Sequence, residues 1–87
     1  MLRVLICYDI HDNSVRGRAF RLLKKNAQRA QKSVFIFEGT DTKLKDLESR
    51  LSQMIEDGDS LMVVPCCDSC FARARMYGGS EELCLVA

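Results

Sequence analysis

The sequence lacks several features by which whole classes of protein are recognised. It has a single histidine, His11, and contains neither a glycine-rich phosphate loop nor a nucleophile elbow. No apolar run approaches the roughly 20 residues that a bilayer-spanning helix needs, and the first residues do not combine a basic start, a long apolar segment and a small-residue cleavage site. We therefore expect a cytoplasmic protein without a membrane segment.

Cysteine is present in an odd number, five, and without secretory features, so we expect reduced thiols rather than a disulfide framework. Cys66, Cys67 and Cys70 contain one C-x-x-C pattern, and with Cys84 four thiolates could bind zinc. A zinc site needs a second correctly spaced pair, however, and redox motifs of the thioredoxin type follow an early strand and open a helix. We expect structurally incidental thiols, and a thiol or zinc module stays open as an alternative.

Acidic residues are absent between Arg16 and Lys32, a segment that carries seven basic side chains. From Met1 to Phe37 eight Lys and Arg face two Asp, giving +6, whereas the remainder has five basic and ten acidic residues, giving −5. Such a one-sign segment is typical of a polyanion site, although a solvated helix face explains it equally well. No RNP1 sequence is present, so an RNA-recognition motif is disfavoured.

With 87 residues and 47% hydrophobic residues, the chain has the length and composition of one small globular domain. Hydrophobic periodicity predicts the following elements. They are a strand over Leu2–Ile10, a helix with apolar positions from Val15 to Ala30, a strand over Gln31–Gly39 that bends into a second short strand, a helix from Leu44 to Ile55 ended by Gly58, and a strand over Ser60–Val64 stopped by Pro65.

This order predicts an α+β fold, a ferredoxin-like split βαβ sandwich with both helices on one face of the sheet. The other face would display Leu5, Cys7 and residues of SVFIF and LMVV, and an uncovered apolar face predicts a second copy. After Pro65 we expect a polar cysteine-rich loop, an exposed strand in FARARMY, a turn at Gly78-Gly79 and a short apolar tail. The domain would cover residues 1–79 and the tail residues 80–87.

A carboxylate, Asp9, ends the apolar first strand on the face assigned to the partner. Two copies of Asp9 near a dimer axis could hold Mg²⁺, because this ion commonly uses only one or two protein carboxylates. The alternative is that Asp9 is a turn aspartate that accepts hydrogen bonds from nearby backbone N–H groups. Asp12 is expected to cap the following helix. His11 is either a proton shuttle or a solvated loop residue.

Several segments in order carry a resemblance to a known family: YDI closing the first strand, NSVRGR opening a basic helix, RAQKSVF after it, then DGDSLMVVP and FARARMYGG. Together they resemble the CRISPR-associated protein 2 family, the small partner of the CRISPR integrase. The resemblance covers nearly the whole chain, from Leu2 to about Gly79.

The resemblance implies a homodimer in which Asp9 and its mate bind a divalent metal, Mg²⁺ or Mn²⁺, in a metal-dependent endonuclease acting on RNA or double-stranded DNA. It also implies a role in CRISPR adaptation, the acquisition of spacers for antiviral defence, where the dimer bridges integrase dimers and holds DNA. A C-terminal strand around Phe71 to Tyr77 would cross to the partner's sheet, and the tail would contact the integrase. Residues expected to support the site or contact the phosphate backbone are Tyr8, Arg16, Arg18, Arg29, Ser33 and Phe35, and the basic segment adds Arg21.

Alternatives remain open at this stage. The protein could be a non-catalytic scaffold that binds duplex DNA, or a ribonuclease toxin on the same dimeric fold. The electrostatics of the Arg16 to Lys32 segment favour backbone binding more directly than hydrolysis, because one acidic ligand per chain is sparse for catalysis. An integrase gene and a repeat array beside this gene would all but exclude the toxin.

Overall fold

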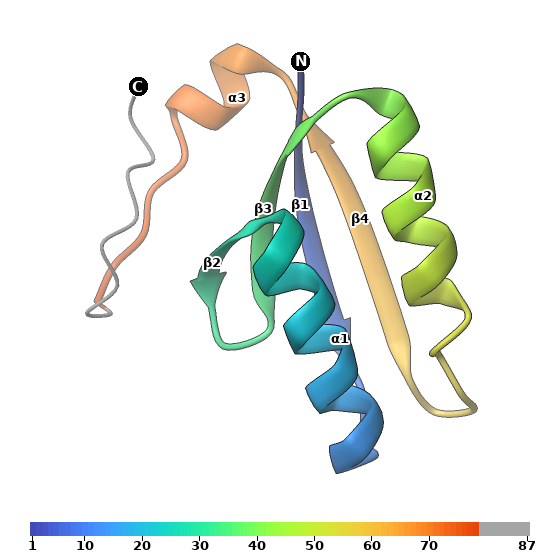
Figure 1. Ribbon diagram of the computed structural model, residues 1–87. Coiled ribbons are helices and arrows are strands. Elements are labelled where there is room, and N and C mark those ends of the chain that lie inside the picture. Colours follow the sequence, from blue (N-terminus) through green and yellow to red (C-terminus); the bar gives the residue numbers. More distant parts are fainter. Residues whose placement is uncertain (79–87) are drawn as a thin grey trace.

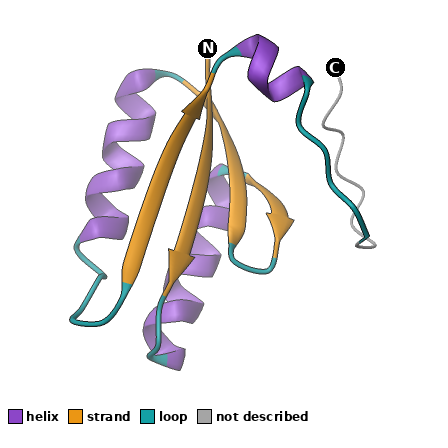
Figure 2. Cartoon of the chain, turned by 180° about the vertical axis from the view of Figure 1, so that it is seen from behind, coloured by secondary structure: helices purple, strands orange, loops and turns teal. Residues whose placement is uncertain are grey.

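A computed structural model of the chain describes residues 1–78, which form one layer of sheet and one layer of helices (Figure 1). The elements in order are β1 (Leu2–Asp9), α1 (Asn13–Asn26), β2 (Gln28–Gln31), β3 (Val34–Gly39), α2 (Asp41–Ser52), β4 (Ser60–Cys66) and α3 (Asp68–Ala72). The strand order is β2-β3-β1-β4, and all neighbouring strands are antiparallel. Both long helices cover the same face of the sheet (Figures 1 and 2). The expected α+β fold of ferredoxin type is confirmed.

The hydrophobic core lies between the sheet and the two long helices. In β1 every second residue faces the helices, and Val4, Ile6 and Tyr8 are buried there. The helices contribute Val15, Ala19, Leu23, Leu44, Leu47 and Leu51. Because burying a large aliphatic or aromatic side chain stabilises a fold by about 1.5 to 3 kcal/mol, this alternation fixes which face of β1 is covered. The predicted split of β1 into two faces is confirmed.

Side-chain caps begin both long helices. The carboxylate of Asp12 accepts a hydrogen bond from the Val15 N–H at 2.9 Å, and the hydroxyl of Thr40 accepts one from the Lys43 N–H at 3.3 Å. Each cap satisfies a backbone donor that has no partner within the helix. The predicted capping role of Asp12 is therefore confirmed.

The end of α1 and the strand after it differ from the prediction. The helix stops at Asn26, and Ala30, expected on its apolar stripe, is buried in β2 instead. The short strand precedes the long one and pairs with it as a hairpin, Gln28 opposite Ile36 and Gln31 opposite Val34. Ladder hydrogen bonds of the hairpin replace those that a longer helix would make, and the spacing of the alanines fits both arrangements.

Pro65 does not stop β4, which continues to Cys66, with Pro65 opposite Val4 of β1. This expectation was wrong because β4 is an edge strand. A proline lacks the N–H that a central strand needs, but at an edge the missing donor costs little.

The segment after β4 also differs from the prediction. Within residues 1–78, the expected polar loop and the first part of the expected FARARMY strand form the short helix α3, and residues 73–78 have no regular structure. The Phe71 N–H donates to the Cys67 carbonyl at 2.9 Å, so these backbone groups are satisfied locally, whereas a strand needs a neighbouring edge. Gly78 has the positive φ of a turn, +77°. Gly79, the proposed boundary at 79/80 and the apolar tail lie outside the described residues.

The second face of the sheet is not covered by α1 or α2 (Figure 2), and it carries apolar side chains, as predicted. Met62 is 58% exposed and Val64 37% exposed, while Leu5, Cys7 and Val34 are partly accessible. We call this set the open face. At one corner of the open face, α3 and the residues after it lie against Leu5, Val34 and Ile36. None of the helices formed by residues 1–78 has the length and apolar character that crossing a membrane requires.

Candidate nucleic-acid interface

Asp9 is the last residue of β1 and lies on the open face, two positions after Cys7. Its backbone is paired with Ser60 of β4, and the residue is exposed. Among residues 1–78, no side chain or backbone N–H donates a hydrogen bond to its carboxylate, and no cation pairs with it. The sequence alternative of a turn aspartate bonded to nearby backbone N–H groups is therefore not what the structure contains.

The loops beside Asp9 are tied together by another carboxylate, Asp59, which the sequence analysis did not single out. Its two oxygens accept the N–H groups of His11 at 3.0 Å and of Glu56 at 3.1 Å. These hydrogen bonds, the one from His11 being the stronger influence, lower the pKa of Asp59 below its ordinary value. The His11 ring donates from Nε2 to the Gly58 carbonyl at 3.0 Å, so His11 serves as a bridge between the two loops. No sequence signal separates Asp59 from its acidic neighbours.

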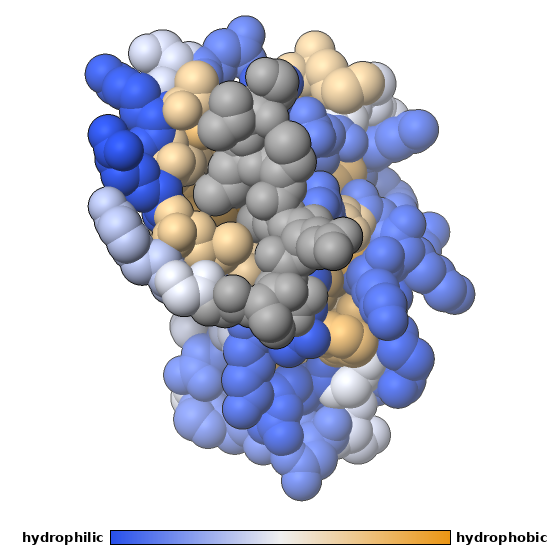
Figure 3. Space-filling view, turned by 90° about the vertical axis from the view of Figure 1, so that its left-hand side faces the viewer, coloured by the Kyte–Doolittle hydropathy of each residue, from blue (hydrophilic) through white to orange (hydrophobic). Residues whose placement is uncertain are grey.

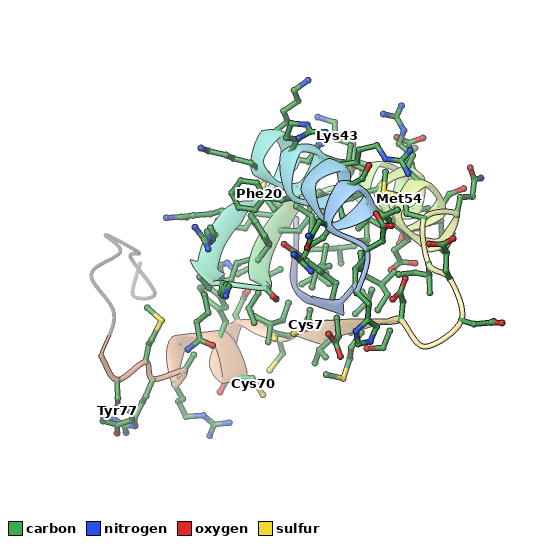
Figure 4. All side chains as sticks on the ribbon, turned by 90° about the horizontal axis from the view of Figure 1, so that it is seen from below. Cys7, Phe20, Lys43, Met54, Cys70 and Tyr77 are labelled. Atoms are coloured by element: carbon green, nitrogen blue, oxygen red, sulfur yellow. The ribbon has the colours of Figure 1, made fainter. Side chains whose placement is uncertain are left out.

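Tyr8 and Phe35 stack inside the core, with ring centroids 6.3 Å apart, and Phe20 of α1 meets Phe35 edge-on at 5.8 Å. The Arg29 guanidinium carbon and the Lys24 ammonium lie 5.2 and 5.8 Å from the Phe20 ring centre. The aromatic groups thus link the core to the basic surface. In Figure 4, Phe20 lies on the helical side of the sheet.

Burial raises the pKa of Tyr8, and the positive charges of Arg29 and Arg16 oppose that effect. Both arginines are therefore electrostatically coupled to Tyr8. Tyr8 also donates its backbone N–H to the carbonyl of Ser33, in the β2–β3 turn, at 3.1 Å. The structure therefore brings Tyr8, Arg29, Phe35 and Ser33 into one region of the molecule.

The side chain of Arg16 forms hydrogen bonds with the turn between β1 and α1. Its guanidinium donates to the carbonyl oxygens of Ile10 at 3.0 Å and His11 at 3.4 Å, and to the side-chain oxygen of Asn13. These contacts hold the chain directly after Asp9, so the structure places Arg16 as a support of the strand end.

Arg18 and Arg21 lie on α1 and are exposed, with no contact to Asp9. Arg18 borders a groove of about 500 Å³ between α1 and α2, which also contains Arg50 and Met54. Among residues 1–78, no hydrogen bond or ion pair joins either arginine to Tyr8, Phe35 or Ser33.

Unpaired positive charge is the main electrostatic feature of the segment from Arg16 to Lys32. All four ion pairs formed within residues 1–78 involve Arg3, Lys45 or Arg50, so none of the seven basic side chains of this segment is neutralised by an acid there. Six of the seven are exposed, and Arg29 is half-buried. Figure 3, which faces the β2 side, shows hydrophilic residues over much of the visible surface. This surface can bind a polyanion without first breaking ion pairs.

A family model described as CRISPR associated protein Cas2 matches residues 1–74. The chain belongs to the Cas2 family. A relative from Thermofilum pendens, named CRISPR-associated endoribonuclease Cas2, is 32% identical over 79 residues, which cover 90% of this chain and 85% of the relative. The family resemblance noted in the sequence is thereby confirmed.

Solved Cas2 structures share the fold. The crystal structure of Streptococcus pyogenes Cas2 at pH 6.5 matches with a TM-score of 0.72 and 28% identity, covering 87% of this chain and 99% of that one. A chain of a structure titled "Partial Cas6-RT-Cas1--Cas2 complex" matches with a TM-score of 0.76 and 24% identity, covering 87% and 90%. The Cas2 fold therefore positions Asp9 and the basic segment of this chain.

Proposed function

We propose that this Cas2 protein acts in CRISPR adaptation by holding RNA or double-stranded DNA through phosphate contacts from the Arg16 to Lys32 segment. The unpaired positive charge of that segment carries the proposal. The name of the Thermofilum pendens relative and the Cas1–Cas2 complex in which a structural neighbour was solved support a nucleic-acid role with an integrase as partner. Phosphate contacts position a duplex without reading its sequence, so we expect binding that is independent of sequence.

A homodimer formed through the open face is part of this proposal. Met62, Val64 and Leu5 expose apolar surface on a sheet that one chain leaves uncovered, and a small domain gains stability by burying it. Asp9 lies on the same face, so a two-fold axis across this face would bring two copies of Asp9 near each other. The pairing also doubles the basic surface available to one duplex.

The binding proposal is tested by charge reversal on α1. We expect Arg18→Glu with Arg21→Glu to weaken duplex binding at least about tenfold and to make the logarithmic salt dependence shallower by about 2 per chain, since each lost phosphate contact removes about 0.9. Lys43→Glu with Lys45→Glu on α2 is the matched control with the same change in net charge. Equal losses in both double variants would show that only net charge matters and would contradict the proposed interface.

A second candidate function, metal-dependent phosphodiester hydrolysis, is favoured by the free carboxylate of Asp9. Carboxylate oxygens are ligands that Mg²⁺ and Mn²⁺ prefer, and Mg²⁺ commonly uses only one or two of them. No three potential metal ligands cluster among residues 1–78, and in this proposal the Asp9 of a partner copy supplies a second carboxylate. Both oxygens of Asp59 already accept backbone N–H groups, those of His11 and Glu56, whereas the Asp9 carboxylate accepts none within residues 1–78.

In this function the two Asp9 carboxylates would hold the cation, which when bound would polarise a phosphodiester and lower the pKa of water. Arg16 keeps the end of β1 and the start of α1 in place through the Ile10 carbonyl. Arg29, held over the Phe20 ring, offers a fixed positive charge to a phosphate oxygen.

Asp9→Asn separates the two functions. We expect cleavage of RNA or duplex DNA in Mg²⁺ or Mn²⁺ to be lost in this variant while duplex affinity is retained, because the change removes one charge from each chain without touching the basic segment. Asp57→Asn, which changes an exposed aspartate of the neighbouring loop, is the matched control. Cleavage by Asp9→Asn at the wild-type rate would refute the metal site, and absence of cleavage by wild type would leave the binding role.

A further inference from the structure

Two thiols, Cys67 and Cys70, lie on the first turn of α3, and both residues are exposed. The helix is docked on the sheet by Arg3, whose guanidinium donates to Asp68 at 3.0 Å and lies 5.0 Å from the ring centre of Phe71. Figure 4 shows Cys70 on the side of the sheet away from α1 and α2. The C-x-x-C pattern therefore opens a helix, as redox motifs of the thioredoxin type do, although it follows β4 and not an early strand.

The two sulfur atoms have different surroundings. The sulfur of Cys67 accepts the Cys70 N–H at 3.2 Å, whereas the sulfur of Cys70 accepts from the Arg73 guanidinium at 3.8 Å. The neighbouring Cys70 side chain and its backbone N–H lower the pKa of Cys67, whereas the pKa of Cys70 is raised by its proximity to Cys67. Cys67 is therefore the more readily deprotonated thiol of the pair.

The other cysteines of the described residues do not share this arrangement. Cys66 donates its thiol hydrogen to the carbonyl of Val64 at 3.6 Å, and burial raises the pKa of Cys7 on the sheet. Within residues 1–78, no three Cys, His, Asp or Glu side chains are placed to hold a metal ion. Cys84, the fourth thiol of the zinc alternative, lies outside the described residues, and the described geometry supports chemistry that two thiols can perform.

We propose that Cys67 and Cys70 form a dithiol site that reacts reversibly with small-molecule disulfides of the glutathione type. The Cys67 thiolate attacks one sulfur of the small disulfide, forms a mixed disulfide and releases one small thiolate. Cys70 then loses its proton to water and attacks the Cys67 sulfur, which forms the Cys67–Cys70 disulfide and releases the second small thiolate. The pair is oxidised by two electrons, and the small disulfide is reduced to two thiols.

Neither thiol belongs to the basic segment or to the surroundings of Asp9, so this site does not depend on phosphate binding or on the metal site. Cys70 does border the open face, through which we propose that two copies pair. The dithiol adds a modification site at the junction between β4 and the C-terminal residues. An intramolecular bond between residues three apart on one helical turn needs no rearrangement of the sheet.

The test uses the full chain, fully reduced and then exposed to oxidised glutathione, with peptide mapping by mass spectrometry. In wild type we expect a Cys67–Cys70 disulfide with no attached glutathione. In Cys70→Ser a glutathione adduct on Cys67 should persist, since the resolving thiol is missing, and in Cys67→Ser the reaction at this turn should slow by about tenfold or more. Cys66→Ser is the matched control and should behave as wild type.

Several results would overturn the proposal. They are disulfides that join two chains instead of one turn, equal glutathione labelling at Cys66 and Cys67, or a Cys66→Ser variant that loses as much reactivity as Cys67→Ser. Purified wild-type protein that retains zinc and loses it in Cys67→Ser would assign the thiols to a metal site instead. Circular dichroism of each variant establishes that the exposed serine substitutions leave the fold intact.

Discussion

Phe20 joins the core to the basic surface, and replacing it tests whether the cations of that region depend on its ring. Its edge meets Phe35 with centroids 5.8 Å apart, while Arg29 and Lys24 lie 5.2 and 5.8 Å from the ring centre. Phe20→Leu keeps an apolar side chain of comparable size but removes the aromatic face. The variant therefore separates the contribution of the ring from that of hydrophobic burial.

The magnitude follows from these three contacts. An edge-on aromatic pair contributes about 0.5 to 1.5 kcal/mol beyond area burial, and a cation over an aromatic face contributes about 0.5 to 1 kcal/mol at an accessible site. Two cations sharing one ring do not both reach the full value, so we expect the free energy of unfolding to fall by about 2 kcal/mol. With a urea slope of about 1 to 2 kcal/mol/M for a domain of this size, the unfolding midpoint should fall by about 1 to 2 M.

The assay is urea unfolding of wild type, Phe20→Leu, Phe20→Tyr and Arg29→Met, together with the Phe20→Leu/Arg29→Met double variant. Phe20→Tyr retains the ring and should stay within about 0.5 kcal/mol of wild type. The double-variant cycle should give a coupling of about 0.5 to 1 kcal/mol between the ring and the guanidinium. If Phe20→Leu and Phe20→Tyr have the same stability, or if the coupling is zero, the ring does not hold Arg29 and the reasoning is refuted.

Two further predictions concern the helix start and the buried tyrosine. Asp12→Ala should lower the free energy of unfolding by about 1 kcal/mol, because the Val15 N–H loses its acceptor at the start of α1, and Asp12→Ser should recover most of the loss in urea unfolding. Because burial raises the pKa of Tyr8 above its ordinary value of 10.0, the unfolded chain loses this proton first and stability should fall as the pH rises past 10.0. Tyr8→Phe should remove that part of the fall in pH-dependent unfolding, and an unchanged slope would contradict it.

The parts of the fold that the sequence predicts are those with a clear repeat. The alternation in β1 separates Val4, Ile6 and Tyr8 from Leu5 and Cys7, because residues on the wrong face of a strand would expose the core. The cap at Asp12 is equally visible, since its side-chain oxygen precedes the apolar stripe of the helix. Local patterns of this kind specify the sheet and the two long helices.

The short elements are not predictable in the same way. Ala30 fits the apolar stripe of α1 as well as a buried position in β2, and only pairing with β3 decides between them. Pro65 ends a strand in most sequences, but its edge position in β4 makes it acceptable. Apolar and polar residues alternate from Phe71 to Tyr77 as they would in a strand. The start of this segment nevertheless forms the helical hydrogen bonds of α3, which a single chain can make without a neighbouring strand. In the first two cases a tertiary contact overrides the local preference, whereas in the third a local helical turn replaces the expected strand.

The basic segment shows a similar limit for the candidate site. Seven positive charges can be counted from the sequence, but the count treats them as equivalent. The structure gives them different surroundings: Arg16 binds backbone carbonyls, Arg29 lies over an aromatic ring, and Arg18 borders the groove between α1 and α2. A charge pattern therefore predicts that a polyanion can bind, whereas the division into supporting and contacting residues needs coordinates.

Asp9 and Asp59 show why exposed acids next to a strand end must be compared by their contacts. Both flank the same pair of neighbouring strands, Asp9 at the end of β1 and Asp59 just before β4. The two oxygens of Asp59 accept the N–H groups of His11 and Glu56. These hydrogen bonds lower the pKa of Asp59 and join the loop after β1 to the loop before β4. Asp9 makes no such contact within residues 1–78, although the loops beside it are held in place by its neighbour. An anchored strand end that carries a free carboxylate on an apolar face is suited to a ligand supplied from outside the chain, because no rearrangement is needed before binding.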